Sequence, residues 1–430
     1  MNFKYNENLL QYIWENQLFD HKNLKTTDNQ RITILKIGFL NSNDGPDFCN
    51  ASIKIGPIIF HGSIEIHTKE SEWNRHGHHD NANYNTVILH VCYETDIRVY
   101  RKDGTLIPSL SLKNRIDHNT LDLYQNLMIN KDFVPCSKLL EKIHILDKVQ
   151  WMDRMVLERL ESRYKNFEAI HVYFNEDWNQ TYYCILLATF GMPKNKECFE
   201  AIAKNLPLKI IKKHQNNLVQ IEALLLGLAG ILEPESTESY FSLLKTEWYF
   251  LQKKYSIYPI NDSIKYSKIR PMNAPHIRLA QFASLLYHSP QLLNVSQISP
   301  KIEEIRNMFN FDLPEFWDTH YNATKKSHLK KKKLSNNFIH HILINAVAPF
   351  IFFYEREKMD RNGQIALNYL SAIPAEKNSI IQKWQSKGVY AKNALYTQGL
   401  LHLYKSYCSS KKCLRCNWGK KILAKNHEFN

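Results

Sequence analysis

Residues 43–93 concentrate side chains that can bind a metal ion or move a proton. Asp47 follows a proline, and Glu65 and His67 stand two positions apart in a β-branched run. Alternate residues of a strand share a face, so Glu65, His67 and Lys69 are expected together on one face. Carboxylate oxygens suit Mg²⁺ or Mn²⁺, which lower the pKa of bound water and neutralise a phosphodiester. The pattern predicts a divalent-metal site with Asp47 and Glu65 as ligands. His67, assisted by Lys69, would activate water there.

Three further metal-capable side chains follow, at His76, His78 and Asp80. They alternate along the chain, so they would line one edge of an extended loop and complete the metal site. Imidazole-rich sets prefer Zn²⁺, Fe²⁺ or Mn²⁺ to Mg²⁺, which makes Zn²⁺ the alternative ion. His90 lies in a predicted strand, where a single histidine is more often a hydrogen-bonded core residue than a ligand. Hydrogen bonds that hold a loop over a small sheet are the alternative explanation, but the set as a whole favours a site.

A second group of possible ligands lies near the other end of the sequence. Cys408, Cys413 and Cys416 form a C-x₄-C-x₂-C pattern, and thiolates suit Zn²⁺ or an iron–sulfur cluster. A fourth ligand is required, and Cys136 is the best distant candidate. The four cysteines are therefore predicted to hold an iron–sulfur cluster or a structural Zn²⁺. Unligated thiols, or a redox pair of Cys413 and Cys416, are the alternatives.

Arg270 and Arg278 flank a proline-containing segment at a predicted helix start. Backbone N–H groups at a helix N-terminus attract anions, and two arginines there would bind a phosphate or nucleic acid. Packing between neighbouring helices is the other interpretation of the same residues.

The composition indicates the number of domains and the kind of partner. The chain has 430 residues, of which 44% are hydrophobic, enough for two or three folded domains. Its net charge of +14 favours a polyanionic partner such as nucleic acid, although a solvated basic surface would carry the same charge.

The N-terminus lacks the pattern of a signal peptide, and the apolar stretch Ile342–Tyr354 is too short to span a membrane and contains Pro349. The eight irregularly spaced cysteines suit a reducing compartment. We therefore expect a soluble, cytoplasmic protein without a membrane partner.

Periodicity predicts the elements that position these residues. Asn6–Gln17 has helical spacing, whereas strand patterns cover Arg31–Leu40, Ala51–Ile55, Pro57–His67 and Tyr84–Glu94. After about residue 116 the period is helical throughout. The sequence thus predicts an α+β protein. A small N-terminal mixed β-sheet domain with a flanking helix would occupy residues 1–115, and a large all-α domain would occupy residues 116–430.

A Pro-Asp pair followed by Glu-x-basic on a neighbouring strand resembles the PD-(D/E)xK nuclease-like superfamily, whose core is restriction-endonuclease-like. The predicted order of one helix and three strands also suits that core. In that scheme Asp47 and Glu65 would hold the metal, and Ile66 would offer its carbonyl. His67 takes the place usually held by lysine, and Glu7 the place of a helical acid. Several nucleases of the superfamily carry an iron–sulfur cluster held by one distant and three grouped cysteines, in a different order of spacing.

Motifs spread over nearly the full length of the chain are GPDF, GSIEIH, W-x₂-H-x-H, LHV, VPC, EALLLGLAGIL, RPMNAPHIRLAQFA and YC-x₄-CLRC. Through these motifs together the chain resembles an uncharacterised bacterial family catalogued as domain of unknown function 2851. The family implies no activity, so three hypotheses stand. The first is a metal-dependent phosphodiesterase or nuclease acting on nucleic acid. The second is a His/carboxylate metal-dependent hydrolase of a small molecule on a barrel-like domain. The third is a non-catalytic nucleic-acid-binding or scaffold protein.

Overall fold

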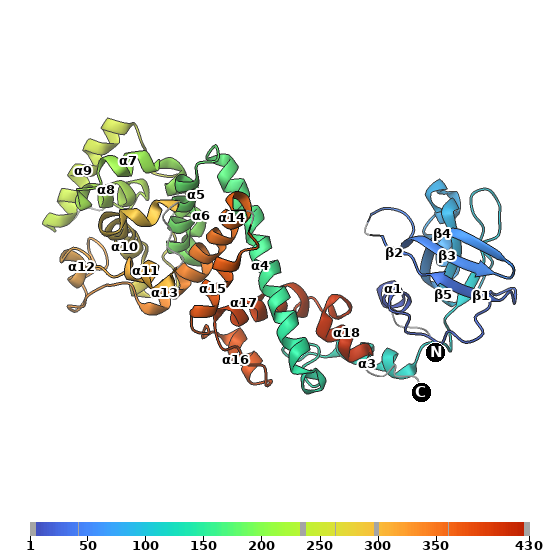
Figure 1. Cartoon of the computed structure of the whole chain (residues 1–430). Coiled ribbons are helices and arrows are strands. Elements are labelled where there is room, and N and C mark those ends of the chain that lie inside the picture. Colours follow the sequence, from blue (N-terminus) through green and yellow to red (C-terminus); the bar gives the residue numbers. More distant parts are fainter. Residues whose placement is uncertain are drawn as a thin grey trace. The chain divides into compact units, whose positions relative to one another are not determined.

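The structure, a computed structural model, describes residues 6–41, 43–232, 238–262, 264–295, 301–359 and 361–424. The chain divides into two compact units. The first combines Met1–Met152 with Lys383–Val389 and Leu401–Asn430, and the second contains Asp153–Gln382 and Tyr390–Leu400. A mixed sheet is followed by a helical region (Figure 1), which confirms the predicted α+β class.

The first unit is built on one mixed sheet of six strands. Pairing is antiparallel between β1 and β3 and between β3 and β4, and β2 also pairs with β3. Pairing is parallel between β4 and β5 and between β5 and β6. The elements in chain order are α1 (Glu7–Glu15), β1 (Ile32–Lys36), β2 (Phe39–Leu40), β3 (Phe48–Ile55), β4 (Ile58–Lys69), α2 (Glu72–Arg75), the 3₁₀ helices η1 (His78–Asp80) and η2 (Ala82–Thr86), β5 (Val87–Glu94) and β6 (Ser109–Ser111).

The connection from β4 to β5 carries several of the predicted site residues. Two parallel strands need a crossover rather than a tight turn, and here the chain passes through α2, η1 and η2. A Cβ atom at Gly62 on β4 would lie 2.3 Å from the carbonyl oxygen of Thr86. Glycine at this position therefore lets the end of the crossover pack directly against β4.

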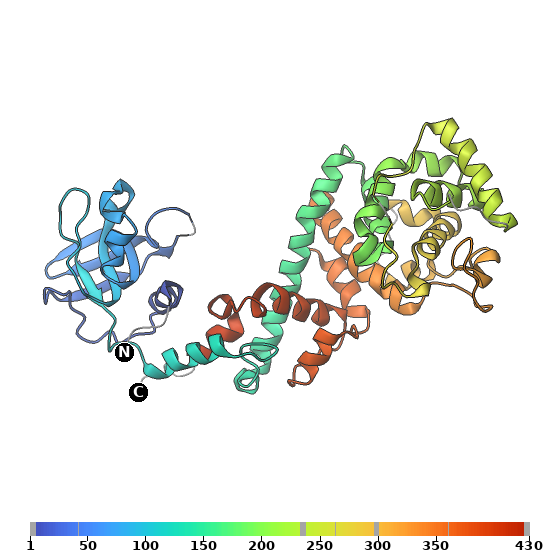
Figure 2. The same cartoon turned by 180° about the vertical axis from the view of Figure 1, so that it is seen from behind.

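Helix α1 covers part of the sheet. The Asn6 side chain caps it by accepting from the Leu9 N–H, and the helix contacts β4. The Trp14 indole N–H donates to the Ile37 carbonyl at 3.1 Å. In both views α1 lies beside the sheet (Figure 1 and Figure 2). Its buried face consists of Leu9, Leu10, Tyr12, Ile13 and Trp14.

The first unit also has a helical part. There α18 (Asn417–Ala424) contacts α3 (His118–Ile129), and the Trp418 ring meets Trp384 edge to face at 5.7 Å. This contact joins the C-terminal segment to the residues that directly follow the sheet. The other short elements here are η3 (Leu140–Lys142), the π-helix η8 (Tyr404–Cys408) and η9 (Cys413–Arg415), and α4 (Ile145–Tyr173) begins in this unit.

The second unit has a helical core in which α5 packs on α6, α8 on α9 and α10, and α14 on α15. A Cβ at Gly227 would lie 2.0 Å from the Trp248 ring, so glycine permits the close approach of α8 and α9. The remaining helices are α5 (Trp178–Phe190), α6 (Met192–Asn205), α7 (Leu208–Lys213), α8 (Leu218–Leu228), α9 (Ser239–Tyr255), η4 (Pro271–Asn273), α10 (Pro275–His288), η5 (Pro290–Leu293), α11 (Ile302–Asn307), α12 (Phe316–Thr319), α13 (Asn336–Ile342), the π-helix η7 (Leu343–Val347), α14 (Ala348–Lys358), α15 (Gln364–Ala372), α16 (Ser379–Gln385) and α17 (Ala394–Leu403).

One continuous helix, Asn336–Lys358, is long and apolar enough to cross a membrane by length and composition, and 72% of its most apolar window is buried. A helix in the core of a soluble protein can have the same length and the same apolar composition. The helix continues through Pro349, which lies two residues after the π-helix η7 ends at Val347. Proline lacks an N–H, and a π-turn changes the local hydrogen-bond pattern so that the helix accommodates it.

Candidate metal centre

Three histidines converge at the end of β4. The ligand atoms of His67, His76 and His78 all lie within 4.8 Å of one another. His67 Nε2 is 3.1 Å from His76 Nδ1, and the His67 and His78 rings stack with centroids 5.3 Å apart. His67 comes from β4, whereas the other two come from the crossover. The sheet and the crossover thus build the group together.

Glu65 completes the group. Its Oε1 lies 3.2 Å from His78 Nε2 and 3.6 Å from His67 Nε2. Donor atoms about 2.1 Å from a tetrahedral ion are separated by about 3.4 Å, and these distances bracket that value. The three histidines thus lie close enough together to share one ion, and Glu65 Oε1 lies at ligand spacing from two of them, His67 and His78.

Asp47 positions Glu65 from the start of β3. Its backbone N–H donates to Glu65 Oε2 at 3.0 Å. Its own carboxylate accepts from the Gln11 side chain at 2.8 Å and from the Ile66 N–H at 3.0 Å. Both Asp47 oxygens are thus engaged by protein donors, while Glu65 Oε1 faces the histidines. Asp47 lies beside Glu65, as the sequence suggested, but this geometry suits a positioning role.

Burial governs the charges of these groups. It raises the pKa of Asp47 to about 7, with Glu65 adding to the effect, and it raises the pKa of Glu65 to about 8. It also lowers the pKa of His67 to about 2 and lowers that of His78. A neutral imidazole has a lone pair that can bind a metal ion. A bound cation would also stabilise the ionised form of the buried carboxyl groups. The donor set therefore fits a divalent metal ion.

His90 on β5 supports the centre from behind. It is fully buried, and its Nε2 lies 2.8 Å from His67 Nδ1. A histidine that ligates a metal through one nitrogen characteristically donates its other N–H to a polar neighbour. This contact leaves His67 Nε2 as the ligand atom. The prediction that His90 is a hydrogen-bonded core histidine agrees with this position.

Side chains around the histidines hold the β4–β5 crossover in position. Tyr84 stacks on His78 with ring centroids 3.8 Å apart. Glu72 accepts from the Thr68 and Lys69 backbone N–H groups and from Arg75, whose side chain is 67% exposed. Arg75 lies next to the exposed His76, so the centre reaches the surface on this side. No sequence pattern pointed to Tyr84, because an aromatic residue between turns looks like ordinary packing.

The structure does not bring every predicted residue to this centre. The Asp80 side chain is 83% exposed and pairs with His79. Lys69 is exposed at the end of β4, and its charge acts on Glu94. Glu7 on α1 was noted only through a family resemblance, yet its Oε1 lies 3.9 Å from His67 Nε2, and burial raises its pKa.

The four predicted cluster cysteines lie in one region of the first unit. Burial and the neighbouring thiols raise the pKa of Cys136 and Cys408 well above the ordinary range. Burial raises the pKa of Cys413 to about 12, with Cys416 adding to it. The thiols are therefore close enough to influence one another, although Cys136 is distant in sequence from the other three.

Cys416 has hydrogen-bond donors around its sulfur. The Trp418 and Gly419 N–H groups donate to Cys416 Sγ. Backbone N–H donors to a cysteine sulfur are among the features that tune iron–sulfur sites.

Arg270 and Arg278 lie in the second unit, at η4 and α10, where both line a cavity. Arg278 is buried and Arg270 is exposed.

These features define an α+β protein whose N-terminal mixed sheet carries a histidine-rich candidate metal centre. The chain belongs to the family described as "Protein of unknown function (DUF2851)", whose model matches residues 7–379. Neither the curated proteins nor the solved structures gave a match.

Proposed function

We propose that this protein is a metal-dependent phosphodiesterase that cleaves nucleic acid. The observation that carries the proposal is the convergence of His67, His76 and His78, with Glu65 Oε1 beside His67 and His78. A metal ion bound there supplies Lewis acidity and a bound water of lowered pKa. Three imidazoles favour Mn²⁺, Zn²⁺ or Fe²⁺ over Mg²⁺.

The protein groups divide the work around that ion. The three histidines hold it through His67 Nε2, His76 Nδ1 and His78 Nε2. Glu65 Oε1, which faces two of these nitrogens, holds the ion or accepts the proton of the attacking water. Asp47 fixes Glu65 through its backbone N–H. Compared with the roles expected from the sequence, His67 becomes a ligand, and Asp47 becomes a positioning residue.

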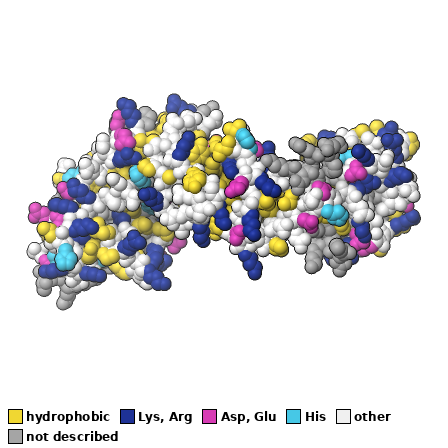
Figure 3. Space-filling model, turned by 90° about the horizontal axis from the view of Figure 1, so that it is seen from below, with side chains coloured by type: hydrophobic (Ala, Val, Ile, Leu, Met, Phe, Trp, Pro, Cys, Tyr) yellow, Lys and Arg dark blue, Asp and Glu magenta, His cyan; other side chains and the backbone are white. Residues whose placement is uncertain are grey.

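The fold and the charge support a nucleic-acid substrate. The sheet is open and mixed with α1 against β4, an arrangement similar to the PD-(D/E)xK core rather than to a closed barrel. The net charge of +14 favours a polyanion. Figure 3 shows Lys and Arg side chains spread over the face in view, with Asp and Glu among them. A nucleic acid would thus meet a diffuse basic surface rather than one patch.

A cleavage assay tests this function. The full chain is incubated with single- and double-stranded DNA and RNA in Mn²⁺, Zn²⁺ or Mg²⁺. Cleavage is expected with Mn²⁺ or Zn²⁺, and Glu65→Gln is expected to lower the rate by about 100-fold or more because it removes the carboxylate beside the ion. His61→Ala is the control, because His61 lies on the same strand but is exposed and contacts Ser52. Absence of cleavage with every ion, or an unchanged rate for Glu65→Gln, would refute the proposal.

A second candidate is a metal-dependent hydrolase of a small phosphodiester. It is supported by the burial of Glu65, His67 and His78, whose exposures are 5%, 1% and 9%. Cleavage of bis(4-nitrophenyl) phosphate without cleavage of any nucleic acid would favour this candidate. Metal binding without hydrolysis of either substrate would favour a non-catalytic protein.

We also propose that Cys136, Cys408, Cys413 and Cys416 hold an iron–sulfur cluster. Its role would be structural, because it would join the C-terminal segment to the residues that follow the sheet. A Cβ at Gly419 would lie 2.1 Å from the Cys413 carbonyl oxygen, so this tight turn requires glycine. All eight cysteines are free, the state expected in a reducing compartment such as the cytoplasm.

Protein purified without oxygen is expected to be brown, with absorbance at about 400 nm and bound iron and sulfide. Cys413→Ser is expected to remove the colour and lower the melting temperature, because the segments lose their common ligand. Cys49→Ser, on β3, should leave the colour unchanged. Colourless protein, or protein containing Zn²⁺ instead of iron, would contradict the assignment.

A further inference from the structure

The second unit contains a cavity of about 860 Å³ that plays no part in the proposed metal chemistry. Three cationic side chains line it, those of Arg270, Arg278 and Lys377, together with one carboxylate, that of Glu376. Small-molecule sites typically measure about 300–1,000 Å³, so this volume suits a ligand of nucleotide size.

Arg278 is the unusual member of this lining. It is 5% exposed, and its guanidinium lies 3.3 Å from the centre of the Phe338 ring. It donates to Gln281 at 2.6 Å and to Asn273 at 2.5 Å, both neutral amides, and its Nε has no hydrogen-bond partner among the residues that the structure describes. Burial alone lowers its pKa to about 9, with no contribution from a carboxylate. A buried guanidinium without a counter-ion is costly, and a bound anion would remove that cost.

A second arginine, Arg163, lies behind the side of the cavity that Arg278 forms. Burial, together with the charges of Arg278 and Arg163, lowers the pKa of His341 to about 4. Arg163 donates to the carbonyl and to the side-chain oxygen of Asn345, both at 2.7 Å. Asn345 belongs to the π-helix η7, and π-turns are frequent at functional sites. The wall around Arg278 is thus cationic over several helices.

Glu376 does not neutralise Arg278. Its carboxylate accepts from Thr397 at 3.0 Å and from Gln398, and its charge acts on Arg159 and Arg163. The cavity therefore keeps an excess of positive charge.

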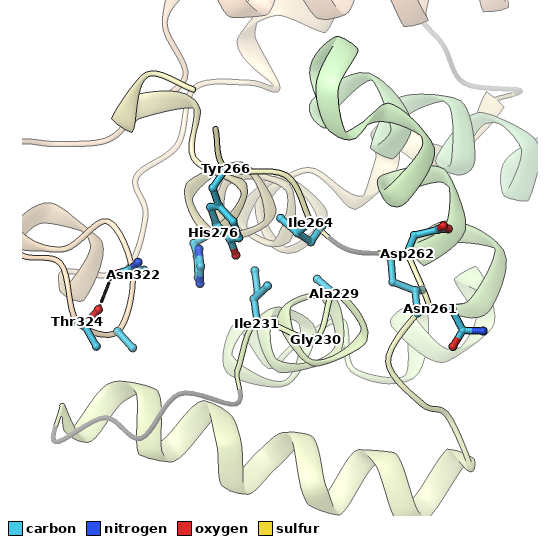
Figure 4. A pocket seen from close by; sticks show the side chains of 12 residues that line it. Ala229, Gly230, Ile231, Asn261, Asp262, Ile264, Tyr266, His276, Asn322 and Thr324 are labelled. Carbon is cyan, nitrogen blue, oxygen red and sulfur yellow. Dashed lines mark hydrogen bonds between the residues drawn. The ribbon is translucent and has the colours of Figure 1, made fainter. Parts of the chain in front are cut away.

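The rest of the lining is suited to an organic body. Met192, Met272, Tyr321 and Ile344 contribute apolar or aromatic surface, and serine and asparagine side chains add hydrogen-bonding groups. A second cavity of the same volume, about 860 Å³, lies in the same unit (Figure 4), with Tyr266, His276 and Ile231 around it. Its described lining contains no lysine or arginine, so it lacks the feature that points to an anion.

We propose that the Arg278 cavity binds an organic phosphate monoester of about mononucleotide size. Arginine guanidinium groups match phosphate oxygens in geometry and charge, and the apolar wall would hold the organic part. Arg278 would contact the phosphate from inside, and Arg270 and Lys377 would contact it from the exposed rim. This site is independent of the N-terminal metal centre.

Calorimetric titration of the metal-stripped full chain in EDTA tests the site, because the chelator prevents phosphate from binding at the metal centre. The probes are the four ribonucleoside 5′-monophosphates, ribose 5-phosphate and the corresponding nucleosides. At least one phosphate monoester is expected to bind and to raise the melting temperature, and the nucleosides are not. Failure of every monoester to bind, or equal binding of a nucleoside and its monophosphate, would overturn the proposal.

Variants then locate the binding. Arg270→Ala and Lys377→Ala are each expected to weaken binding by about tenfold, since each removes one charge-assisted contact. Both side chains are exposed, so the fold should survive. Lys253→Ala on α9, exposed and outside the cavity, is the matched control. Arg278→Met is expected to abolish binding, provided circular dichroism shows a folded protein. Unchanged affinity in both rim variants would place the ligand elsewhere and refute the site.

Discussion

Replacement of His76 with alanine is expected to weaken metal binding by at least about 100-fold, because loss of a second-shell partner alone typically costs 10–100-fold. His76 is the most informative ligand to remove, since it is exposed while its Nδ1 faces His67 Nε2 at 3.1 Å. The fold does not depend on burial of its ring. Isothermal titration of Mn²⁺ or Zn²⁺ into metal-stripped protein measures the effect.

Two companion variants sharpen this result. His90→Asn is expected to lower metal affinity by about 10–100-fold, since His90 contacts His67 Nδ1 from behind. His61→Ala should leave affinity unchanged. Because the proposed cysteine site would also take up added metal ions, each titration is compared with the same variant carrying Cys413→Ser. Wild-type affinity in His76→Ala would exclude His76 as a ligand.

The second large effect concerns stability. Glu222 is fully buried in the second unit, where it accepts from Tyr240 at 3.0 Å and from the Trp317 indole at 2.6 Å. Burial raises its pKa to about 7 from an ordinary value of 4.5. The folded state therefore holds this proton at a pH where the unfolded state has lost it. Stability falls as the pH rises from about 4.5 to about 7 and then levels off.

Glu222→Gln removes this dependence. Relative to the wild type, the free energy of unfolding of the variant is expected to gain about 3 kcal/mol between pH 4.5 and pH 8. At pH 4.5 the two proteins should differ little, because the amide replaces a neutral carboxyl of similar shape. Urea unfolding at several pH values measures this, with the exposed Glu197→Gln as control. If the difference in the free energy of unfolding between variant and wild type did not change with pH, Glu222 would not hold a proton in the folded state as described.

The sequence predicted the sheet well because strand periodicity is local. The alternation on β4 placed Glu65 and His67 on one face, and the structure brings both to the centre. The crossover was harder to predict, since His76, His78 and Asp80 alternate in sequence but belong to a helix end and a 3₁₀ turn. That geometry turns two of them inward and leaves Asp80 exposed.

Long-range packing accounts for the other differences. No local pattern indicates that the C-terminal segment shares a unit with the sheet, because this depends on the contact of α18 with α3. The burial of Arg278 against Phe338 was equally unpredictable, since arginine is usually exposed. The engagement of both Asp47 oxygens depends on Gln11 from α1 and on the backbone of β4.

Anomalous diffraction from crystals grown with Zn²⁺ or Mn²⁺, recorded at the edge of that metal, tests the central claim most directly. We expect a peak about 2.1 Å from His67 Nε2, His76 Nδ1 and His78 Nε2, with Glu65 Oε1 adjacent. A map without a peak at these atoms, in which His67 is hydrogen-bonded to His76 and His90 instead, would contradict the account.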